Sequence, residues 1–285
     1  MSSDYINKAS EGKNSCGRYV GSVLLILFMW MIVGGIFTVI IDGIGRYVIK
    51  TELAFYISLN VGFIFFLLGI VIANKSIHKR TFKSLITPKD KISWKRFFVG
   101  FGVYFLLVAI SSVIEYFIEP TAVSFYSSLP KLLMFLPLAV IFTFIQTSTE
   151  ELFFRGYILQ GFGQRVKNPI TLAIISGVIF MVPHLANPEV SKSMLLLPPY
   201  YFGVGFILAL VTLKSDSLEL AIGAHAANNF FGAFVMNFKG SALEGTYSIW
   251  LTSRFSPEYN LISFVIIAIL FYIILFKYLK VDKKY

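Results

Sequence analysis

Long apolar runs alternate with short polar gaps along nearly the whole chain. An α-helix needs about 20 consecutive, mostly apolar residues to cross a bilayer, and eight runs approach or exceed that length. They cover residues 19–41, 53–73, 97–118, 131–155, 169–185, 194–213, 217–238 and 258–277. The pattern predicts an all-α, polytopic membrane helix bundle with about eight transmembrane helices, of which the fifth is short.

The polar residues 1–18 precede the first apolar run. This run of roughly 23 residues is longer than the core of a signal peptide, which has about 7–15 residues, and no small-residue cleavage site follows it. We therefore expect it to be retained as the first helix. The predicted organisation is a polar tail over residues 1–18 and a single membrane domain over residues 19–285.

Composition and charge support a membrane protein and indicate its orientation. Hydrophobic residues make up 56% of the chain and charged residues 14%, whereas soluble domains carry about 25% charged residues. The net charge of +10 does not indicate nucleic-acid binding, because Lys and Arg lie in the gaps between apolar runs. With a cytoplasmic N-terminus, all but six of the 25 basic residues fall on the cytoplasmic side, as the positive-inside rule requires. The six are Arg46, Lys50, Lys131, Lys192, Lys239 and Arg254.

We therefore predict that the tail and both termini are cytoplasmic, in a multi-pass protein of the cell membrane, or of an endomembrane in a eukaryote. The longest polar gap, residues 74–96, is strongly basic and contains several aromatic and aliphatic residues. Two interpretations of it stay open: it lies along an anionic membrane surface, or it is a solvated orientation signal. Cys16 is the only cysteine, which excludes an internal disulfide framework and a Cys-based metal site.

Ionisable side chains interrupt several of the apolar runs. A charge at the centre of a membrane helix costs about 2.5–3.5 kcal/mol on insertion scales, so such residues are functional candidates. Glu151 and Arg155 are four residues apart with the acid first, the favourable order for a helical ion pair. Glu150 lies about 100° around the helix from Glu151. We predict that Glu151 pairs with Arg155 and that Glu150 is left free to face a cavity.

Two of the three histidines, His184 and His225, also lie in apolar runs. Glu150 and His184 are equally far from the turn around residue 167, so antiparallel helices would bring them to one depth, roughly 22 Å from that turn. Asn229 follows His225 by four residues and shares its helix face, and Asn228 is a near neighbour.

This set of side chains suits the hydrolysis of an amide in a partly dry cleft. Glu150 is the candidate general base, and His184 is the candidate residue for holding and polarising the water. His225 and Asn229 are candidate hydrogen-bond donors to the oxyanion of a tetrahedral intermediate, worth about 3–4 kcal/mol per donor.

Three motifs carry a resemblance to a known family. "EELFFR" from Glu150 to Arg155 has the form EExxxR, "FMVPH" from Phe180 to His184 has the form FxxxH, and "HAANN" from His225 to Asn229 has the form HxxxN. Together and in this order they resemble the CAAX prenyl endopeptidase and bacteriocin-processing family of intramembrane proteases, also called CPBP or Abi. The resemblance covers roughly residues 130–235, which we take as the catalytic core.

The resemblance implies an eight-helix intramembrane endopeptidase. By its motifs, Glu150 and His184 activate the water, and His225 and Asn229 form the oxyanion site. Glu151, Arg155, Phe180 and Asn228 are expected to support them. The implied partners are membrane lipid and a peptide or lipidated protein substrate. In bacterial relatives they also include a membrane sensor kinase or a peptide toxin.

Several alternatives stay open at this point. Glu150, His184 and His225 would also make an acceptable zinc ligand set with a water in the fourth position; we expect metal-free catalysis without a cofactor, because Asn229 beside His225 suits an oxyanion donor. A non-proteolytic scaffold, or an immunity or regulatory protein that binds a membrane partner, is the main alternative function. A transporter is a third, although its expected paired helix breaks are not found.

Other intramembrane proteases fit the sequence less well. A site-two zinc protease needs an HExxH motif, an aspartyl protease needs two buried aspartates, and a rhomboid-like enzyme needs a GxSxG-type serine; the sequence has none of these patterns in its apolar runs.

Overall fold

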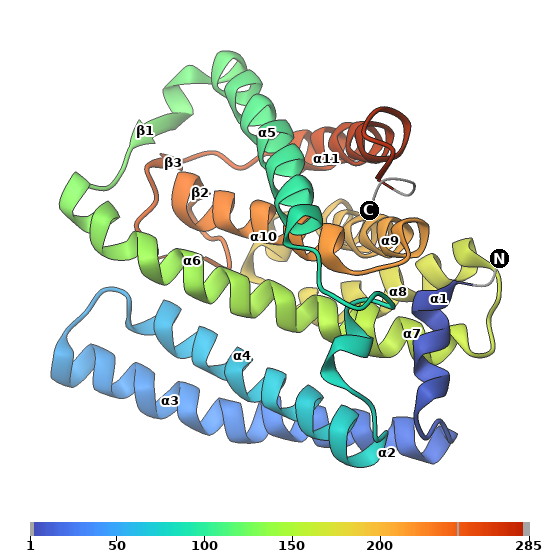
Figure 1. Cartoon of the computed structure of the whole chain (residues 1–285). Coiled ribbons are helices and arrows are strands. Elements are labelled where there is room, and N and C mark those ends of the chain that lie inside the picture. The colour runs from blue at the N-terminus through green and yellow to red at the C-terminus, as the bar shows by residue number, and fades with distance from the viewer. Residues whose placement is uncertain (1–2, 244, 282–285) are drawn as a thin grey trace.

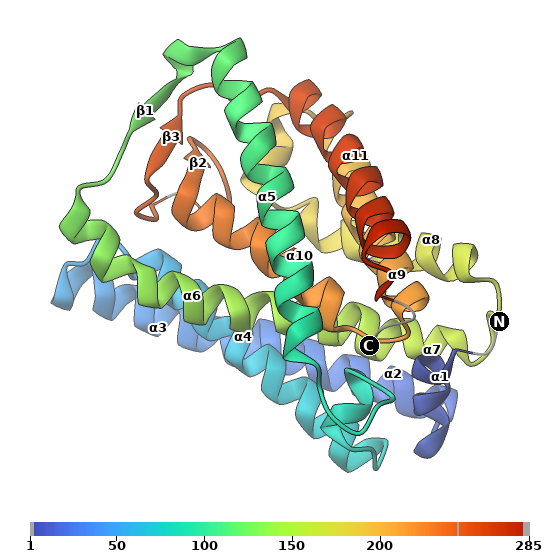
Figure 2. The same ribbon diagram turned by 45° about the horizontal axis from the view of Figure 1, so that its top comes forward.

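The computed structural model describes residues 3–243 and 245–281, most of which are helical. The long helices run beside one another, and three short strands lie at one end of the bundle (Figures 1 and 2). The helices are α1 (Asp4–Asn7), α2 (Cys16–Leu27), α3 (Gly35–Gly43), α4 (Ala54–Ile72), α5 (Trp94–Ile118), α6 (Leu129–Glu151), α7 (Leu159–Gly163), α8 (Pro169–His184), α9 (Leu197–Ser215), α10 (Glu219–Phe230) and α11 (Pro257–Ile273). The strands are β1 (Val123–Phe125), β2 (Met236–Phe238) and β3 (Trp250–Thr252).

Six continuous helical segments of the described residues are long and apolar enough to cross a membrane. They are Cys16–Ile49, Ala54–Ile77, Trp94–Ile118, Leu129–Gly163, Leu197–Ser215 and Pro257–Tyr278. The all-α membrane bundle predicted from the sequence is confirmed, and the chain is a multi-pass membrane protein.

The two remaining predicted helices, α8 and α10, are present but short. α8 has 16 residues, and α10 has 12 before it continues as the π-helical segment η9 (Phe231–Val235). The residues of α10 from Glu219 to Ala227 are buried, because this helix packs against α5, α6 and α9. A short buried helix packs inside a core and does not need the length of a lipid-facing span. The predicted count of eight membrane crossings is therefore not confirmed.

The helix that carries the candidate glutamates runs further than its hydropathy predicts. α6 continues through the π-helical segment η7 (Leu152–Ile158) into α7 and ends at Gly163, whereas the apolar run ends near Arg155. The guanidinium of Arg155 is paired with Glu151 inside the bundle. Because this charge is compensated within the helix, it does not end the helix.

The small sheet was not predicted from the sequence. β3 is its central strand and pairs antiparallel with β1 and parallel with β2. Each strand has three residues, too few for an alternating pattern to stand out. We call this end of the bundle, with the strands and the loop of residues 185–196, the sheet end.

The opposite end, which we call the terminal end, is made by α1, residues 74–93, the turn at residues 214–218 and Val281. Tyr5 is fully buried, and its hydroxyl donates to Leu85 O at 2.7 Å and to Arg155 O at 3.2 Å. The described N-terminal segment therefore packs against the bundle through Tyr5, and the division into a polar tail over residues 1–18 and a membrane domain stays a prediction. Residues 1–2 and 282–285 of the predicted segments lie outside the described residues.

The two ends of the described chain are tied to the same turn, directly at Tyr5 and through Arg96 at Val281. The backbone N–H of Tyr5 donates to Asp216 at 3.1 Å, while Arg96 donates to Ser215 O and Val281 O at 3.0 Å each. Figure 1 shows both termini on this side of the bundle. The two ends of the described chain thus lie on one side of the bundle, and their cytoplasmic location stays a prediction.

Candidate active site

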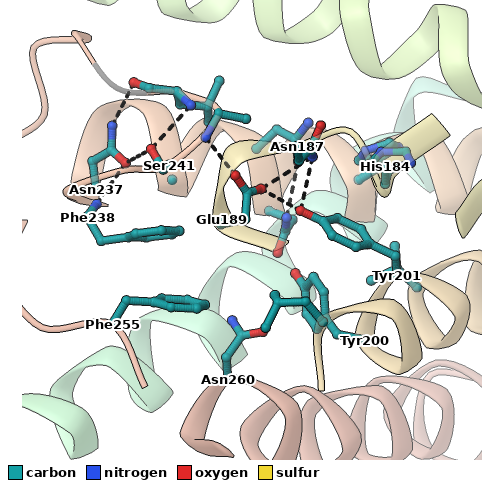
Figure 3. Close-up of a pocket in the computed structure, with 18 of the residues that line it drawn as sticks. His184, Asn187, Glu189, Tyr200, Tyr201, Asn237, Phe238, Ser241, Phe255 and Asn260 are labelled. Carbon is teal, nitrogen blue, oxygen red and sulfur yellow. Dashed lines mark hydrogen bonds between the residues drawn. The ribbon is translucent and has the colours of Figure 1, made fainter. Parts of the chain in front are cut away.

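A cavity of about 190 Å³ lies among α6, α8, α9 and α10 and extends toward the sheet end (Figure 3). All four catalytic candidates from the sequence line it: Glu150, His184, His225 and Asn229. Asn228 and Phe180 line it as well. The structure therefore brings three separate sequence motifs to one cavity.

Glu150 lies between the two histidines at the inner end of this cavity. Its Oε2 atom is 3.8 Å from Nε2 of His184 and 3.8 Å from Nε2 of His225. The residue is only 6% exposed, and Oε2 has no hydrogen-bond partner among residues 3–243 and 245–281. These separations are too long for direct hydrogen bonds, and a polar separation of this size is where a bridging water is expected.

His184 is held at the end of α8 by its own helix. Its Nδ1 atom is 2.7 Å from the carbonyl oxygen of Phe180, one turn earlier, and the two rings stack with centroids 4.2 Å apart. Because a carbonyl oxygen can only accept, Nδ1 carries the proton. In the neutral ring the lone pair of Nε2 therefore faces Glu150.

His225 is held by Glu151. Its Nδ1 atom lies 2.8 Å from Oε1 of Glu151, which also accepts from Arg155 at 2.7 Å. A carboxylate that is paired with Arg155 acts as an acceptor, so Nδ1 of His225 carries the proton and Nε2 again faces Glu150. The predicted Glu151–Arg155 pair is confirmed, and it has a further function that the sequence did not suggest, because it orients His225.

Arg155 and Phe180 also hold the two site histidines in place. Arg155 is fully buried, donates to Gly205 O of α9 at 3.2 Å, and places its guanidinium 4.4 Å from the centroid of the Phe180 ring. Phe180 also meets the ring of His225 edge-on at 5.9 Å. One aromatic ring therefore packs against both site histidines and against the cation below them.

The two asparagines of α10 bond to each other. Nδ2 of Asn228 donates to Oδ1 of Asn229 at 3.1 Å. This bond uses the acceptor of Asn229 and leaves its amide N–H groups as the available donors. A donor is the group that an oxyanion requires.

The outer part of the cavity contains residues that the sequence did not identify. Glu189 accepts from the hydroxyl of Tyr201, from Asn187 at 3.3 Å and from the backbone N–H of Ala242 at 2.9 Å. It therefore ties the loop after α8 to α9 and to the loop after β2 (Figure 3). Its position five residues after His184 was the available signal. Gln146, one helical turn before Glu150, also lines the cavity, and its four-residue separation from Glu150 on one helix was the signal for it.

The zinc alternative can be tested against this donor set. Within the two described stretches, no group of three or more His, Cys, Asp or Glu side chains is arranged to hold a metal ion. Ligands that bind a tetrahedral zinc ion at about 2.0–2.2 Å lie about 3.3–3.6 Å from one another, close to the 3.8 Å that separates Oε2 of Glu150 from Nε2 of each histidine, so the choice between zinc and metal-free catalysis stays a prediction. We derive no step through a metal.

Comparison with known proteins places the site motifs in a family. Residues 131–231 match the family described as type II CAAX prenyl endopeptidase Rce1-like. The uncharacterized protein YyaK of Bacillus subtilis (strain 168) is 34% identical over 263 residues, which cover 88% of each chain. No solved structure matches the chain.

Proposed function

The chain belongs to the CAAX-type, Rce1-like family of intramembrane proteases, and from this premise we propose that it hydrolyses a peptide bond with a water activated by Glu150. The observation that carries the proposal is the placement of the Glu150 carboxylate, buried and 3.8 Å from two imidazole Nε2 atoms. The proposed substrate is a membrane-associated or prenylated protein or peptide.

The hydrogen-bond chemistry of the cavity supports this role. Oε2 of Glu150 and the two Nε2 lone pairs are all acceptors, so a hydrogen donor is needed between them. A water that donates one hydrogen to Glu150 and the other to His184 satisfies both groups. Its oxygen lone pair then points away from them, toward a substrate carbonyl in the cavity.

The reaction proceeds through a tetrahedral intermediate. Glu150 takes a proton from the water as the water oxygen bonds to the carbonyl carbon. The carbonyl oxygen becomes an oxyanion, which accepts a hydrogen bond from the side-chain amide of Asn229. The C–N bond then breaks, and the proton held by Glu150 passes to the leaving nitrogen.

His225 has a conditional part in this scheme. Because its Nδ1–H is bonded to Glu151, it can donate from Nε2 only when the ring carries a second proton. We therefore assign the oxyanion contact to the side-chain amide of Asn229, and the donor role expected of His225 from the sequence stays a prediction.

The proposal is tested by comparing peptides from membranes of cells that express the parent protein or Glu150→Gln at equal levels. Mass spectrometry should find cleavage products in the parent sample that are missing from the variant sample. Glu52→Gln at the surface is the matched control and should give the parent products. Identical products from the parent and Glu150→Gln would contradict the assignment. A phenotype that survives Glu150→Gln would favour the scaffold or regulatory alternative.

Zinc use is separated by a measurement on purified protein. The parent, treated with a strong chelator and checked for zinc by elemental analysis, should keep its activity. Loss of activity on chelation, with recovery on adding zinc, would contradict metal-free catalysis and favour the alternative in which Glu150, His184 and His225 are zinc ligands.

A further inference from the structure

A second cavity adjoins the one that contains the catalytic candidates. It has a volume of about 200 Å³ and lies between α5 and α11. The two cavities share a wall that includes Tyr200, Asn228 and Asn260, and Figure 3 shows Tyr200 beside Asn260. Asn228 is the hydrogen-bond partner of the proposed oxyanion donor Asn229. A peptide whose scissile bond lies at the proposed catalytic site can therefore extend into the second cavity.

The lining of the second cavity is polar for a space between two membrane helices. The hydroxyl of Tyr259 on α11 donates to Ser111 O on α5 at 2.6 Å and joins the two helices. Oδ1 of Asn260 is buried without a hydrogen-bond partner among residues 3–243 and 245–281. An unpaired amide oxygen accepts a hydrogen bond from a backbone N–H, so the shared wall offers a peptide a contact that these residues do not use.

One ionisable side chain lies in this polar space. Glu115 is the only charged residue among the described residues that line the second cavity. It is half-buried near the end of α5, one helical turn after Ser111. Residues four apart lie on the same helix face, so Glu115 follows the bond between Ser111 and Tyr259 along the cavity wall.

The next acid of the same helix has the partner that Glu115 lacks. Glu119 is paired with Nη1 of Arg254 at 3.1 Å. The side chain of Glu115 has no ion pair or hydrogen bond with another residue of the described chain, in which the charge that acts on it is the carboxylate of Glu119. Ionisable side chains in membrane helices normally pair with one another. Glu115 is therefore suited to a cation that comes from outside the described chain.

We propose that Glu115 determines specificity by binding a Lys or Arg side chain of the peptide that occupies the two cavities. That this peptide is a substrate rests on the proposed function, whereas the recognition of its cation does not. Between two membrane helices, a carboxylate attracts a cation more strongly than it does in water. A neutral side chain at the same place leaves Glu115 unpaired, and an acidic one is repelled, so the site discriminates among peptides by charge.

Peptide binding tests this recognition without depending on catalysis. The purified protein carries Glu150→Gln, so that no peptide is cut by the proposed mechanism. The probes are short peptides of Ala, Ser and Leu with a neutral fluorescent dye, in which a single Lys occupies each position in turn. Matched sets carry Gln or Glu in place of the Lys. The dissociation constant of each peptide is measured by fluorescence anisotropy.

Three further variants are made in this Glu150→Gln protein. Glu115→Gln removes the charge, and Glu115→Lys reverses it. Glu119→Gln is the matched control, because it removes the neighbouring carboxylate of the same helix, which does not line the second cavity. We expect Lys at one peptide position to lower the Kd about tenfold relative to Gln at that position, as for a desolvated charge pair.

The preference for Lys should vanish with Glu115→Gln, change to a preference for Glu with Glu115→Lys, and persist with Glu119→Gln. A purely structural role of Glu115 would not reverse the preference. If Glu115→Lys does not fold, Glu115→Gln still decides. Equal Kd values for the Lys and Gln peptides at every position, or a Lys preference that survives Glu115→Gln, would overturn the proposal.

The same peptides separate this proposal from the proposed function. Each is incubated with the parent protein, and cleavage is followed by mass spectrometry. A Lys preference in binding that depends on Glu115, without cleavage that depends on Glu150, would leave the recognition intact and contradict the hydrolysis. Cleavage that depends on Glu150 but is equally fast for Lys and Gln peptides in the parent and in Glu115→Gln would contradict the recognition alone.

Discussion

The protein contains two buried, histidine-containing polar clusters, and they use their histidines differently. His78, at the terminal end, is fully buried and has both ring nitrogens bonded: Nδ1 to Lys13 O at 2.8 Å, and Nε2 to the hydroxyls of Tyr157 at 2.5 Å and Ser22 at 3.2 Å. His184 and His225 have hydrogen-bond partners within residues 3–243 and 245–281 only at Nδ1, and their Nε2 atoms face Glu150 across 3.8 Å.

We interpret this difference as the difference between a structural cluster and the proposed catalytic one. Buried polar groups are normally hydrogen-bonded, and each exception in a folded protein calls for an explanation. At His78 the protein supplies a partner for each nitrogen. At Glu150 the buried acceptors face one another, which is an unfavourable arrangement unless a molecule from outside the chain completes it. We take that molecule to be the hydrolytic water.

Replacing one histidine of each cluster by glutamine is the most direct test of this difference. His184→Gln should lower peptide hydrolysis by about 10²-fold or more with little change in melting temperature. His78→Gln should lower the melting temperature, because a buried network loses its partners, and should keep the hydrolysis rate per folded molecule. Rates and melting temperatures are measured on the same detergent-purified samples. If His184→Gln lowered the melting temperature but kept the parent hydrolysis rate, both clusters would have a structural role only.

Glu151→Gln tests the support beneath the site. The change leaves the buried guanidinium of Arg155 without its counter-charge, and breaking a buried ion pair in this way costs about 3–5 kcal/mol. It also removes the acceptor that orients His225, so activity should fall as well. The measurement is thermal unfolding in detergent, with the exposed pair variant Glu52→Gln as control, which should unfold like the parent. An unfolding temperature equal to that of the parent would show that the pair does not stabilise the bundle.

Tyr157→Phe should have a smaller effect. It removes the hydroxyl that bonds Nε2 of His78 and should lower stability by about 0.5–1.5 kcal/mol. Hydrolysis should stay at the parent rate, because Tyr157 contacts the structural cluster and not the cavity. A lower hydrolysis rate at unchanged stability in Tyr157→Phe would show that the His78 cluster affects the proposed catalytic site.

The smallest expected effect is a pH dependence that belongs to His78. Burial lowers the pKa of this imidazole below its usual value of 6.5, so the folded state binds its proton less readily than the unfolded chain. Stability is therefore unaffected above about pH 6.5 and falls as the pH drops below it, until the lowered pKa is passed. Melting temperatures of the parent at pH 7.5 and 5.5 should differ by more than those of His78→Gln. If the melting temperature changed equally with pH in the parent and in His78→Gln, His78 would not be the cause of the pH dependence.

The sequence predicted the parts of the site that depend on spacing along one helix. The Glu151–Arg155 pair follows from four residues of separation, and the free position of Glu150 follows from its angle to Glu151. The meeting of Glu150 with His184 was predicted from their equal distance to the connecting turn. These relations need only helix geometry.

The features that were missed depend on how helices pack. The bond from His225 to Glu151 joins α10 to α6, and nothing in either segment alone indicates that contact. α10 is short because it is buried between neighbouring helices and does not need the length of a lipid-facing span. The packing of the N-terminal segment was missed because its few apolar residues, such as Tyr5 and Ile6, are surrounded by polar ones. The three-residue strands are likewise set by contacts between distant segments.

The central claim is that the Glu150 carboxylate activates the hydrolytic water. The most direct measurement is the rate at which purified parent and Glu150→Gln cleave a peptide identified from the membrane comparison, with the folded fractions matched by melting temperature. The account predicts a decrease of about 10³-fold or more at unchanged stability. A Glu150→Gln rate within about tenfold of the parent rate would contradict it, because a positioned general base contributes at least about 10²-fold.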